Sequence, residues 1–264
     1  ARDRVVSLFF HGLARGFRTG DGCDVLPQDA SHSYFVQTYR ARSGRAAARR
    51  IATARRRTQP VRAERVASFR VTCRADPVDF PTGISRIVTE TPNIKAFRLR
   101  PVADDGRMPF SFEPGQFLNT TFGIGGARMV RSYSISSSPM QREYVELTVR
   151  REPRGAVSRH VVDLLKVGDH VEVRGPVGKF TFNGSEADSI VLIAGGVGIT
   201  PMMSITRYLT EQAWAGDIFL IYACRAPADF IFASELAVLQ QVNPKLHMTV
   251  TMSRPEGTAW QGSR

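Results

Sequence analysis

The chain has 264 residues, enough for two domains of ordinary size, which excludes a small disulfide-stapled protein. Hydrophobic residues make up 42% and charged residues 23%, so the chain as a whole is neither fibrous nor disordered in composition. The net charge of +12 belongs to residues 1–75, where 16 arginines face 5 acidic residues and lysine is absent. The remainder of the chain is nearly neutral.

Residues 1–76 are expected to form a poorly ordered extension. The stretch 40–74 is rich in Arg and Ala, nearly free of acid and without helical or strand periodicity, so it is not expected to pack a core. An electrostatic arm for nucleic acid and an organelle transit peptide are the two alternatives. A nucleic-acid arm would normally carry Lys and interleaved aromatics, so no nucleic-acid partner is expected.

Residues 77–184 predict an antiparallel barrel or sandwich. Short apolar alternations are separated by Gly, Pro and Asp, and Gly125-Gly126 between two apolar runs predicts a two-residue hairpin turn. A helical insertion is expected over 158–165, ending near Gly168. The expected strands are 83–90, 94–101, 116–124, 129–136, 144–150 and 170–174.

Residues 185–264 predict a partial doubly wound parallel α/β domain. Apolar runs at 189–194, 218–223 and 246–252 alternate with helical patterns at 199–213 and 233–241. Continuous apolar strands that alternate with helices are typical of a parallel sheet buried on both faces. No run approaches the roughly 20 residues that a membrane-spanning helix requires, so no membrane span is expected.

A glycine-rich turn joins the first of these strands to its helix. Gly195, Gly196 and Gly198 precede a helix that is expected to be capped by Thr200, with Pro201 in its first turn. Unpaired N–H groups at a helix start bind anions, and glycines let a dinucleotide pyrophosphate approach the backbone. The spacing departs from G-x-G-x-x-G, so a tight strand-to-helix turn is the alternative interpretation.

A second constellation is Arg131-Ser132-Tyr133-Ser134. Strand alternation puts Arg131 and Tyr133 on one face, and an arginine beside an aromatic ring suits a ligand with a phosphate and a flat ring. Tyr133 as an ordinary barrel core residue is the alternative.

The order of the motifs is more specific than any one of them. In this order and at these spacings the chain resembles the ferredoxin–NADP reductase superfamily, especially the reductase components that feed electrons to bacterial oxygenases. The resemblance covers roughly residues 80–264 and implies a flavin-binding Greek-key barrel followed by a nicotinamide-binding α/β domain. The motifs are PGQF at 114–117, RSYS at 131–134, GAVS at 155–158, GPVGKF at 175–180, GGVGITPMMS at 195–204 and YACRAPADFIFASEL at 222–236.

The resemblance implies roles for individual residues. Arg131 would pair with a flavin phosphate, Tyr133 would pack on the isoalloxazine or ribityl part, and Ser134 would hydrogen-bond near flavin N5. Ser134 and Thr200, the latter close to the nicotinamide, are the catalytic candidates. The other implied cofactor-binding positions are Ser132 and Arg150 on the flavin side, Gly155, Ala156, Val157 and Ser158 for the FAD pyrophosphate, Gly195, Gly196, Gly198 and Pro201 for the nicotinamide dinucleotide, and Arg225, Ser253 and Arg254 for a 2′-phosphate.

Two features of the family are missing from the sequence: a late strand ending in Cys-Gly-Pro and a [2Fe–2S] domain. The chain is therefore expected to be C-terminally truncated. Its three cysteines, Cys23, Cys73 and Cys224, lie far apart without Cys-x-x-Cys spacing, so no metal site is expected in this chain. Cys224 is expected to be an inert buried thiol, and a reducing, cytoplasmic setting is expected.

The implied function is that of an FAD-dependent NAD(P)H oxidoreductase that passes electrons to an iron–sulfur protein or oxygenase. NADPH and NADH both remain open, and a [2Fe–2S] cluster is expected in a partner or in a missing C-terminal domain. The alternatives are a reductase with a free ferredoxin or haem-protein acceptor, and a catalytically incomplete flavin-binding subunit.

Overall fold

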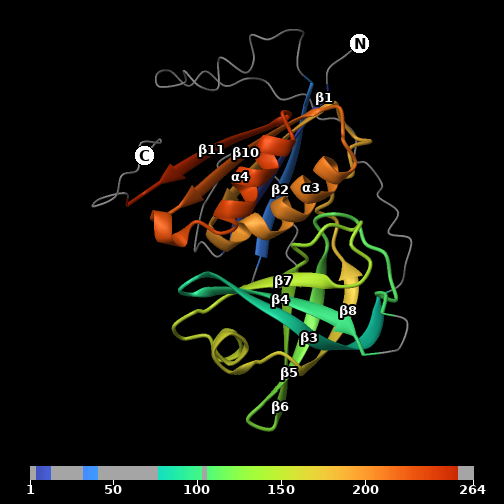
Figure 1. Cartoon of the computed structure of the whole chain (residues 1–264), viewed down its shortest axis with the longest axis vertical. Helices are drawn as coiled ribbons and strands as arrows, with labels where there is room; N and C mark the ends of the chain where they lie inside the picture. Colours follow the sequence, from blue (N-terminus) through green and yellow to red (C-terminus); the bar gives the residue numbers. More distant parts are fainter. Residues whose placement is uncertain (1–3, 13–31, 41–76, 103–105, 255–264) are drawn as a thin grey trace.

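A computed structural model describes residues 4–12, 32–40, 77–102 and 106–254. Figure 1 shows two parts: a curled antiparallel sheet, and a second sheet with helices packed on it. Each part has its own cluster of buried apolar side chains. In the described part of the chain, no helix is both long enough and apolar enough to span a bilayer.

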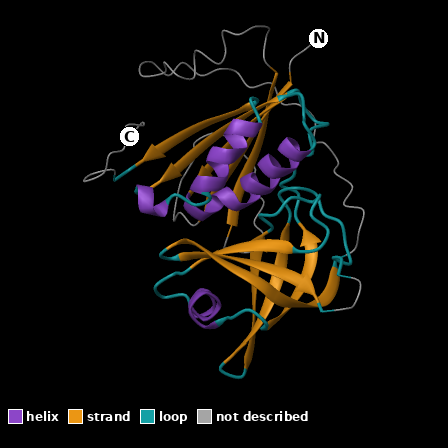
Figure 2. Ribbon diagram, viewed as in Figure 1, coloured by secondary structure: helices purple, strands orange, loops and turns teal. Residues whose placement is uncertain are grey.

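The antiparallel sheet has six strands in the order β6-β5-β8-β3-β4-β7. Its two edge strands approach each other at one end, where Ile135 bridges to Leu147 and the Ser136 N–H donates to the Glu146 carbonyl oxygen at 2.8 Å. The sheet is therefore curled into a half-barrel, as Figure 2 shows. The strands are β3 (Val78–Thr91), β4 (Ile94–Pro101), β5 (Phe117–Ile124), β6 (Ala127–Ser134), β7 (Val145–Arg150) and β8 (His170–Val177).

These bounds confirm all six expected strands, with shifts of a few residues at their ends. Gly125 and Gly126 have φ of 59° and 80°, which is the conformation that a two-residue hairpin turn between β5 and β6 requires. The helical insertion is also present, as α2 (Ala156–Arg159) continued by a π-helix, η1 (His160–Leu164). Val157, Val161 and Val162 of this insertion are buried against the barrel core.

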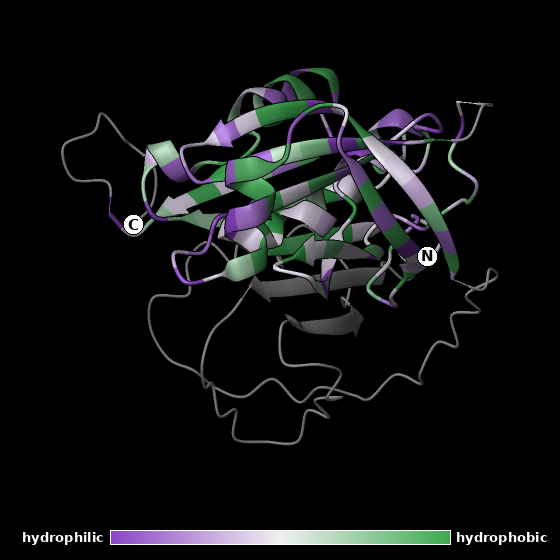
Figure 3. Cartoon of the chain, turned by 90° about the horizontal axis from the view of Figure 1, so that it is seen from below, coloured by the Kyte–Doolittle hydropathy of each residue, from purple (hydrophilic) through white to green (hydrophobic). Residues whose placement is uncertain are grey.

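Hydrophobic and polar residues alternate along the barrel strands (Figure 3). On β5, Leu118, Thr120 and Phe122 are buried while their neighbours are partly exposed, as expected for a strand with one face on the core. Strand β7 departs from this pattern because every residue from Val145 to Val149 is buried. On its outer face, Glu146 pairs with Arg207 of the α/β part and Thr148 contacts Ser136.

The PGQF motif fixes the start of β5 against the segment that leads out of the barrel. Gly115 has a φ of 104°, and a Cβ there would lie 2.2 Å from the Phe180 carbonyl oxygen, so only glycine fits. The buried Gln116 side chain accepts from the Glu113 N–H at 2.9 Å and donates to the Gly178 carbonyl oxygen at 3.3 Å. These contacts therefore pack the PGQF motif directly against the GPVGKF motif.

The second sheet has the order β11-β10-β9-β1-β2. Strands β9 (Ser189–Gly195), β10 (Asp217–Cys224) and β11 (Leu246–Met252) are parallel, joined by α3 (Ile199–Glu211) and α4 (Ala233–Val242). Because β–α–β crossovers are right-handed and both move the same way across the sheet, both helices cover one face (Figure 1). This is one half of the expected doubly wound pattern.

The structure differs from the expected N-terminal extension at two segments. Strand β1 (Arg4–Gly12) pairs in parallel with β9, and β2 (His32–Arg40) pairs antiparallel with β1. The apolar run 5–10 gives the first segment a strand-forming sequence, and the pairing covers an edge of β9 that would otherwise be open. The Arg-rich stretch 41–76 lies outside the described residues.

Candidate active site

The glycine-rich turn leaves backbone open to a ligand at the start of α3. Gly196 has a φ of 52°, and a Cβ added to Gly195 or Gly196 would meet no atom within 4 Å. The N-cap residue of α3, Gly198, has no side chain that could cap the helix, and the Ile199 N–H donates to the Gly196 carbonyl oxygen of the preceding 3-10 turn. A glycine cradle beside an uncapped helix start fits a dinucleotide pyrophosphate.

Thr200 and Pro201 lie within the first turn of α3 rather than at its cap, which corrects the expectation that Thr200 caps the helix. The Thr200 hydroxyl donates to the Val197 carbonyl oxygen at 3.1 Å, and Thr200 is only 5% exposed. That hydrogen bond holds the turn in shape. The proximity of Thr200 to a nicotinamide stays a prediction.

Strand β6, which carries the RSYS motif, is an edge of the barrel sheet and pairs with β5. Arg131 is exposed, and its Nη1 donates to the Val130 carbonyl oxygen at 2.7 Å. Ser132 donates to Asn119 Oδ1 at 2.6 Å, and Ser134 is partly buried at the end of the strand. The motif therefore presents its arginine to the outside on an accessible strand.

Tyr133 packs on the barrel core, which is the alternative interpretation of this residue. It is partly buried and lies edge-on to Phe122 with ring centroids 6.5 Å apart. Burial raises the pKa of Tyr133 to about 12, although the charge of Arg131 opposes this shift. The phenol is therefore neutral at physiological pH, and its contact with a flavin stays a prediction.

The GAVS segment supplies the N-cap residue of α2, Gly155, and the first three residues of that helix. The Ser158 hydroxyl accepts from the Glu152 N–H at 3.1 Å and donates to the Gly155 carbonyl oxygen at 3.4 Å. A Cβ at Gly155 would lie 2.3 Å from Ser158 Oγ, so a larger residue there would displace this hydroxyl from its hydrogen bonds. Arg150 pairs with Glu152 at 3.2 Å, as a strand-end charge would. Flavin roles for Arg150, Ala156 and Val157 stay predictions.

Two arginines meet at the carboxyl ends of β10 and β11. The Arg254 N–H donates to the Arg225 carbonyl oxygen at 2.7 Å, and the Ser253 N–H donates to the Cys224 carbonyl oxygen at 3.2 Å. Arg225, Ser253 and Arg254 are all exposed there. Burial raises the pKa of Cys224 to about 11, with a smaller contribution from Asp229, which agrees with the expected inert thiol.

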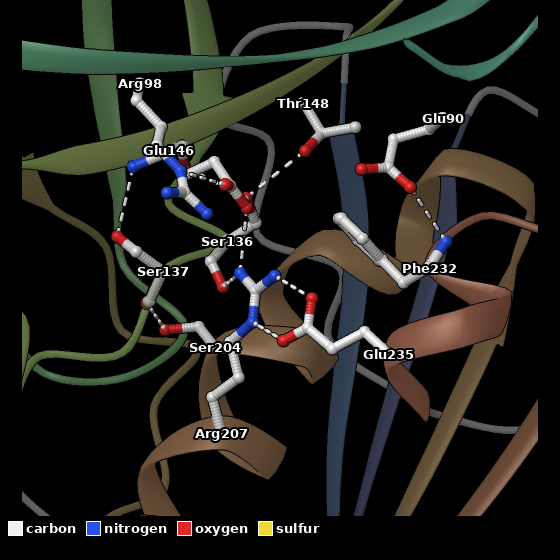
Figure 4. A network of polar contacts seen from close by, with 10 residues as sticks. All are labelled: Glu90, Arg98, Ser136, Ser137, Glu146, Thr148, Ser204, Arg207, Phe232 and Glu235. Atoms are coloured by element: carbon white, nitrogen blue, oxygen red, sulfur yellow. Dashed lines mark hydrogen bonds and ion pairs between the residues drawn. The ribbon is translucent and has the colours of Figure 1, made fainter. Parts of the chain in front are cut away.

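An ion-pair network that no sequence motif indicates lies where α3 meets β7 (Figure 4). Arg207 Nη1 lies 2.9 Å from Glu146 Oε1, and the two side chains are only 11% and 4% exposed. The guanidinium also pairs with both oxygens of Glu235 on α4, at 2.7 and 2.6 Å. Burial would raise the pKa of Glu146, but Arg207 and Arg98 hold it below its ordinary value. Among the described residues, no group of three acidic, histidine or cysteine side chains is placed to bind a metal.

Glu90 of β3 lies at the edge of this network. Its carboxylate accepts from the Phe232 N–H at 3.2 Å. Burial raises the pKa of Glu90, and the charges of Glu146 and Glu235 raise it further, while the Phe232 hydrogen bond and the Arg207 charge oppose the shift. Ionising Glu90 in the folded protein is therefore unfavourable relative to the unfolded chain.

We expect Glu90→Gln to raise the melting temperature at pH 7, because the amide oxygen still accepts from Phe232 without the charge. A raised carboxyl pKa means that the folded state binds more protons above pH 4.5, so wild-type stability falls as pH rises through that window. The difference between the two proteins should vanish below pH 4.5. Thermal denaturation between pH 4 and 8 measures it.

The matched control is Glu143→Gln, which removes a carboxylate from an exposed ion pair with Arg100. Exposed pairs contribute about 0–1 kcal/mol, so little change is expected there. A lower melting temperature for Glu90→Gln at pH 7 would show that the Arg207 charge outweighs burial at this carboxylate.

Comparison with known proteins identifies both parts of the fold. The oxidoreductase FAD-binding domain model matches residues 81–182 and the oxidoreductase NAD-binding domain model matches residues 192–264. The glycine betaine monooxygenase reductase subunit of Chromohalobacter salexigens is 35% identical over 181 residues, which cover 68% of this chain and 48% of that protein.

Solved structures of similar proteins agree with these two domain assignments. The FAD/NAD-binding domain of nitric oxide dioxygenase from Vibrio cholerae superposes with a TM-score of 0.62 at 29% identity, covering 68% of this chain and 76% of that one. A cytochrome P450 reductase from Amycolatopsis superposes with a TM-score of 0.62 at 26% identity, covering 71% and 55%.

A curled flavin-type barrel followed by a nicotinamide-type α/β domain defines a two-domain class of FAD- and NAD-binding oxidoreductases. The chain belongs to the ferredoxin–NADP reductase family within this class. It spans about half the length of the curated relatives that it matches.

Proposed function

We propose that this chain is the FAD- and nicotinamide-binding part of an NAD(P)H oxidoreductase that passes electrons to an iron–sulfur protein or an oxygenase component. The observation that carries the proposal is the open glycine cradle of Gly195 and Gly196 at the start of α3, in a helix that also contacts the segment after the RSYS strand. One helix thus connects the two candidate cofactor sites.

The chain's own residues bind and orient in this proposal. Arg131 would hold a flavin phosphate from the exposed edge of β6, Tyr133 would contact the flavin with its neutral ring, and Ser134 would donate a hydrogen bond near N5. The amides at the start of α3 would hold the coenzyme pyrophosphate. A bound flavin supplies the chemistry, since it takes a hydride and releases electrons singly.

Arg225 and Arg254 favour NADPH as the hydride donor. Both are exposed at adjacent strand ends, and their backbones are joined by a hydrogen bond, so two guanidinium groups can reach one phosphate. NADH lacks the 2′-phosphate that these two arginines would bind.

The test is a titration of the purified chain with FAD, followed by anaerobic addition of NADPH or NADH. We expect about one FAD per chain and bleaching of the flavin absorbance, with NADPH effective at the lower concentration. Arg225→Ala should reduce the preference for NADPH and leave reduction by NADH unchanged. A folded chain that takes up no FAD would contradict the proposal, and one that binds FAD without being reduced would favour a flavin-binding subunit.

The acceptor is proposed from the relatives' names. The glycine betaine monooxygenase reductase subunit and the propane 2-monooxygenase reductase component of Rhodococcus jostii, which is 30% identical, are named for oxygenase systems. A [2Fe–2S] cluster would then lie in a partner or in a further domain. The Amycolatopsis neighbour is named as a cytochrome P450 reductase, which favours a haem protein as the second candidate acceptor.

A further inference from the structure

One face of α3 holds the segment 136–138, which we call the linker loop because it follows directly after β6. The three contacting residues are spaced three and four positions apart, so they lie on a single face of the helix. Figure 4 draws the contacts that Ser204 and Arg207 make with this loop. The contacts are Ser204 Oγ donating to the Ser137 carbonyl oxygen at 2.8 Å, Arg207 Nη1 donating to the Ser136 carbonyl oxygen at 2.6 Å, and Ser138 Oγ donating to the Glu211 carboxylate.

The linker loop is also hydrogen-bonded to strand β7 of the barrel. The Ser136 N–H donates to the Glu146 carbonyl oxygen at 2.8 Å, and the Glu146 N–H donates to Ser137 Oγ at 3.0 Å. Ser136, Ser137 and Ser138 are each at most 3% exposed. Glu146 also pairs with Arg207, so the loop, β7 and α3 form one hydrogen-bonded unit.

This unit lies between the two candidate cofactor sites. Ser134 at the end of β6 is two residues before the linker loop, and Thr200 is four residues before Ser204 on α3, a rise of about 6 Å. A shift of α3 against the loop would therefore move the dinucleotide cradle relative to the flavin strand.

We infer that Ser204, Arg207 and Glu211 are positioning residues that set the distance between the nicotinamide and flavin sites. The inference rests on the proposed function. Hydride transfer requires reacting atoms about 3–3.5 Å apart, and a misplacement of about 1 Å costs roughly 100-fold in rate. Contacts that only hold two domains together would change stability without changing that rate.

Two variants weaken the unit without removing its charge. Arg207→Lys keeps a cation but loses the planar fork that reaches Glu146, Glu235 and the loop together, and Ser204→Ala removes one hydrogen bond. The matched control is Thr206→Val on the same helix. Thr206 is fully buried, and among the described residues its hydroxyl has no hydrogen-bond partner.

The first measurement is stopped-flow reduction of the FAD-loaded chain over a range of NADPH concentrations. For Arg207→Lys we expect the limiting rate to fall about 10- to 100-fold while the coenzyme dissociation constant changes less than about threefold. Ser204→Ala should show a smaller fall, and Thr206→Val should match the wild type. An unchanged limiting rate in folded Arg207→Lys would overturn the inference.

The second measurement is hydrogen exchange of the full chain without coenzyme, which needs no turnover. The Ser136 amide should exchange faster in Arg207→Lys and Ser204→Ala than in Thr206→Val, because its loop loses contacts with α3. Equal exchange in all three variants would overturn the inference. If neither coenzyme reduces the wild type, the proposed function fails, and the exchange result still decides whether α3 fixes the loop.

Discussion

Arg131→Ala should weaken FAD binding by about 10- to 100-fold. The proposed contact is a charge-assisted hydrogen bond to phosphate, and hydrogen bonds to charged groups contribute about 1.5–3 kcal/mol. Arg131 is exposed on the edge strand β6, and among the described residues it forms no ion pair with a carboxylate. Its charge is therefore available to a ligand, and fluorescence titration with FAD measures the loss.

Arg128→Ala is the matched control for this variant. Arg128 lies on the same strand but on the opposite face, because the two positions differ by an odd number of residues, and it pairs with Glu172 at 2.6 Å. Its removal should leave FAD affinity unchanged. Equal losses in the two variants would indicate a general electrostatic effect, and no loss in Arg131→Ala would remove this residue from the flavin site.

The strands and helices from residue 78 onward could be predicted because local pattern and tertiary environment agree there. Alternation over 94–101 gives β4 with the same bounds, and the continuous apolar run 189–194 gives β9 to within one residue. The glycines at 125 and 126 fix a turn by their φ alone. At these positions the local preference of the sequence and the tertiary environment favour the same conformation.

Strand β7 shows why part of the site was missed. The alternating run 144–150 predicts a strand but not what covers its polar face, and in the structure Arg207 of α3 pairs with the buried Glu146 there. Glu146 and Arg207 are 61 residues apart in the chain, and a single sequence gives no signal for such a pairing. Thr200 was misplaced by two residues because the turn before α3 is a 3-10 segment, Gly196–Gly198, not a capped helix start.

The N-terminal segment was misjudged for a different reason. The composition of residues 1–76 is dominated by the Arg-rich stretch, which hides the short apolar run 5–10 that forms much of β1. Strand addition to a sheet edge depends on a free edge elsewhere in the fold, here that of β9. The segment's own periodicity cannot reveal such an edge.

Arg207→Met should lower the free energy of unfolding by about 3 kcal/mol, measured by urea denaturation at pH 7. Breaking a buried ion pair costs about 3–5 kcal/mol because it leaves a buried charge without its partner. The lower end applies because Arg98 still contacts Glu146, at 3.0 Å. Methionine keeps most of the apolar stem, so the loss reports mainly on the guanidinium.

The double variant Arg207→Met with Glu146→Gln separates the stranded charge from the lost contacts. Once the carboxylate is gone, part of the loss should be recovered, so the two changes should be non-additive. The pH dependence has a defined sign. Because the folded protein holds the pKa of Glu146 below its ordinary value of 4.5, the pair stabilises the fold at neutral pH, and this contribution is lost as pH falls through the folded pKa. The penalty of Arg207→Met should therefore shrink in acid. A penalty that is additive and constant with pH would mean that the uncharged contact with the Ser136 carbonyl oxygen, not the carboxylate pairs, carries the stabilisation.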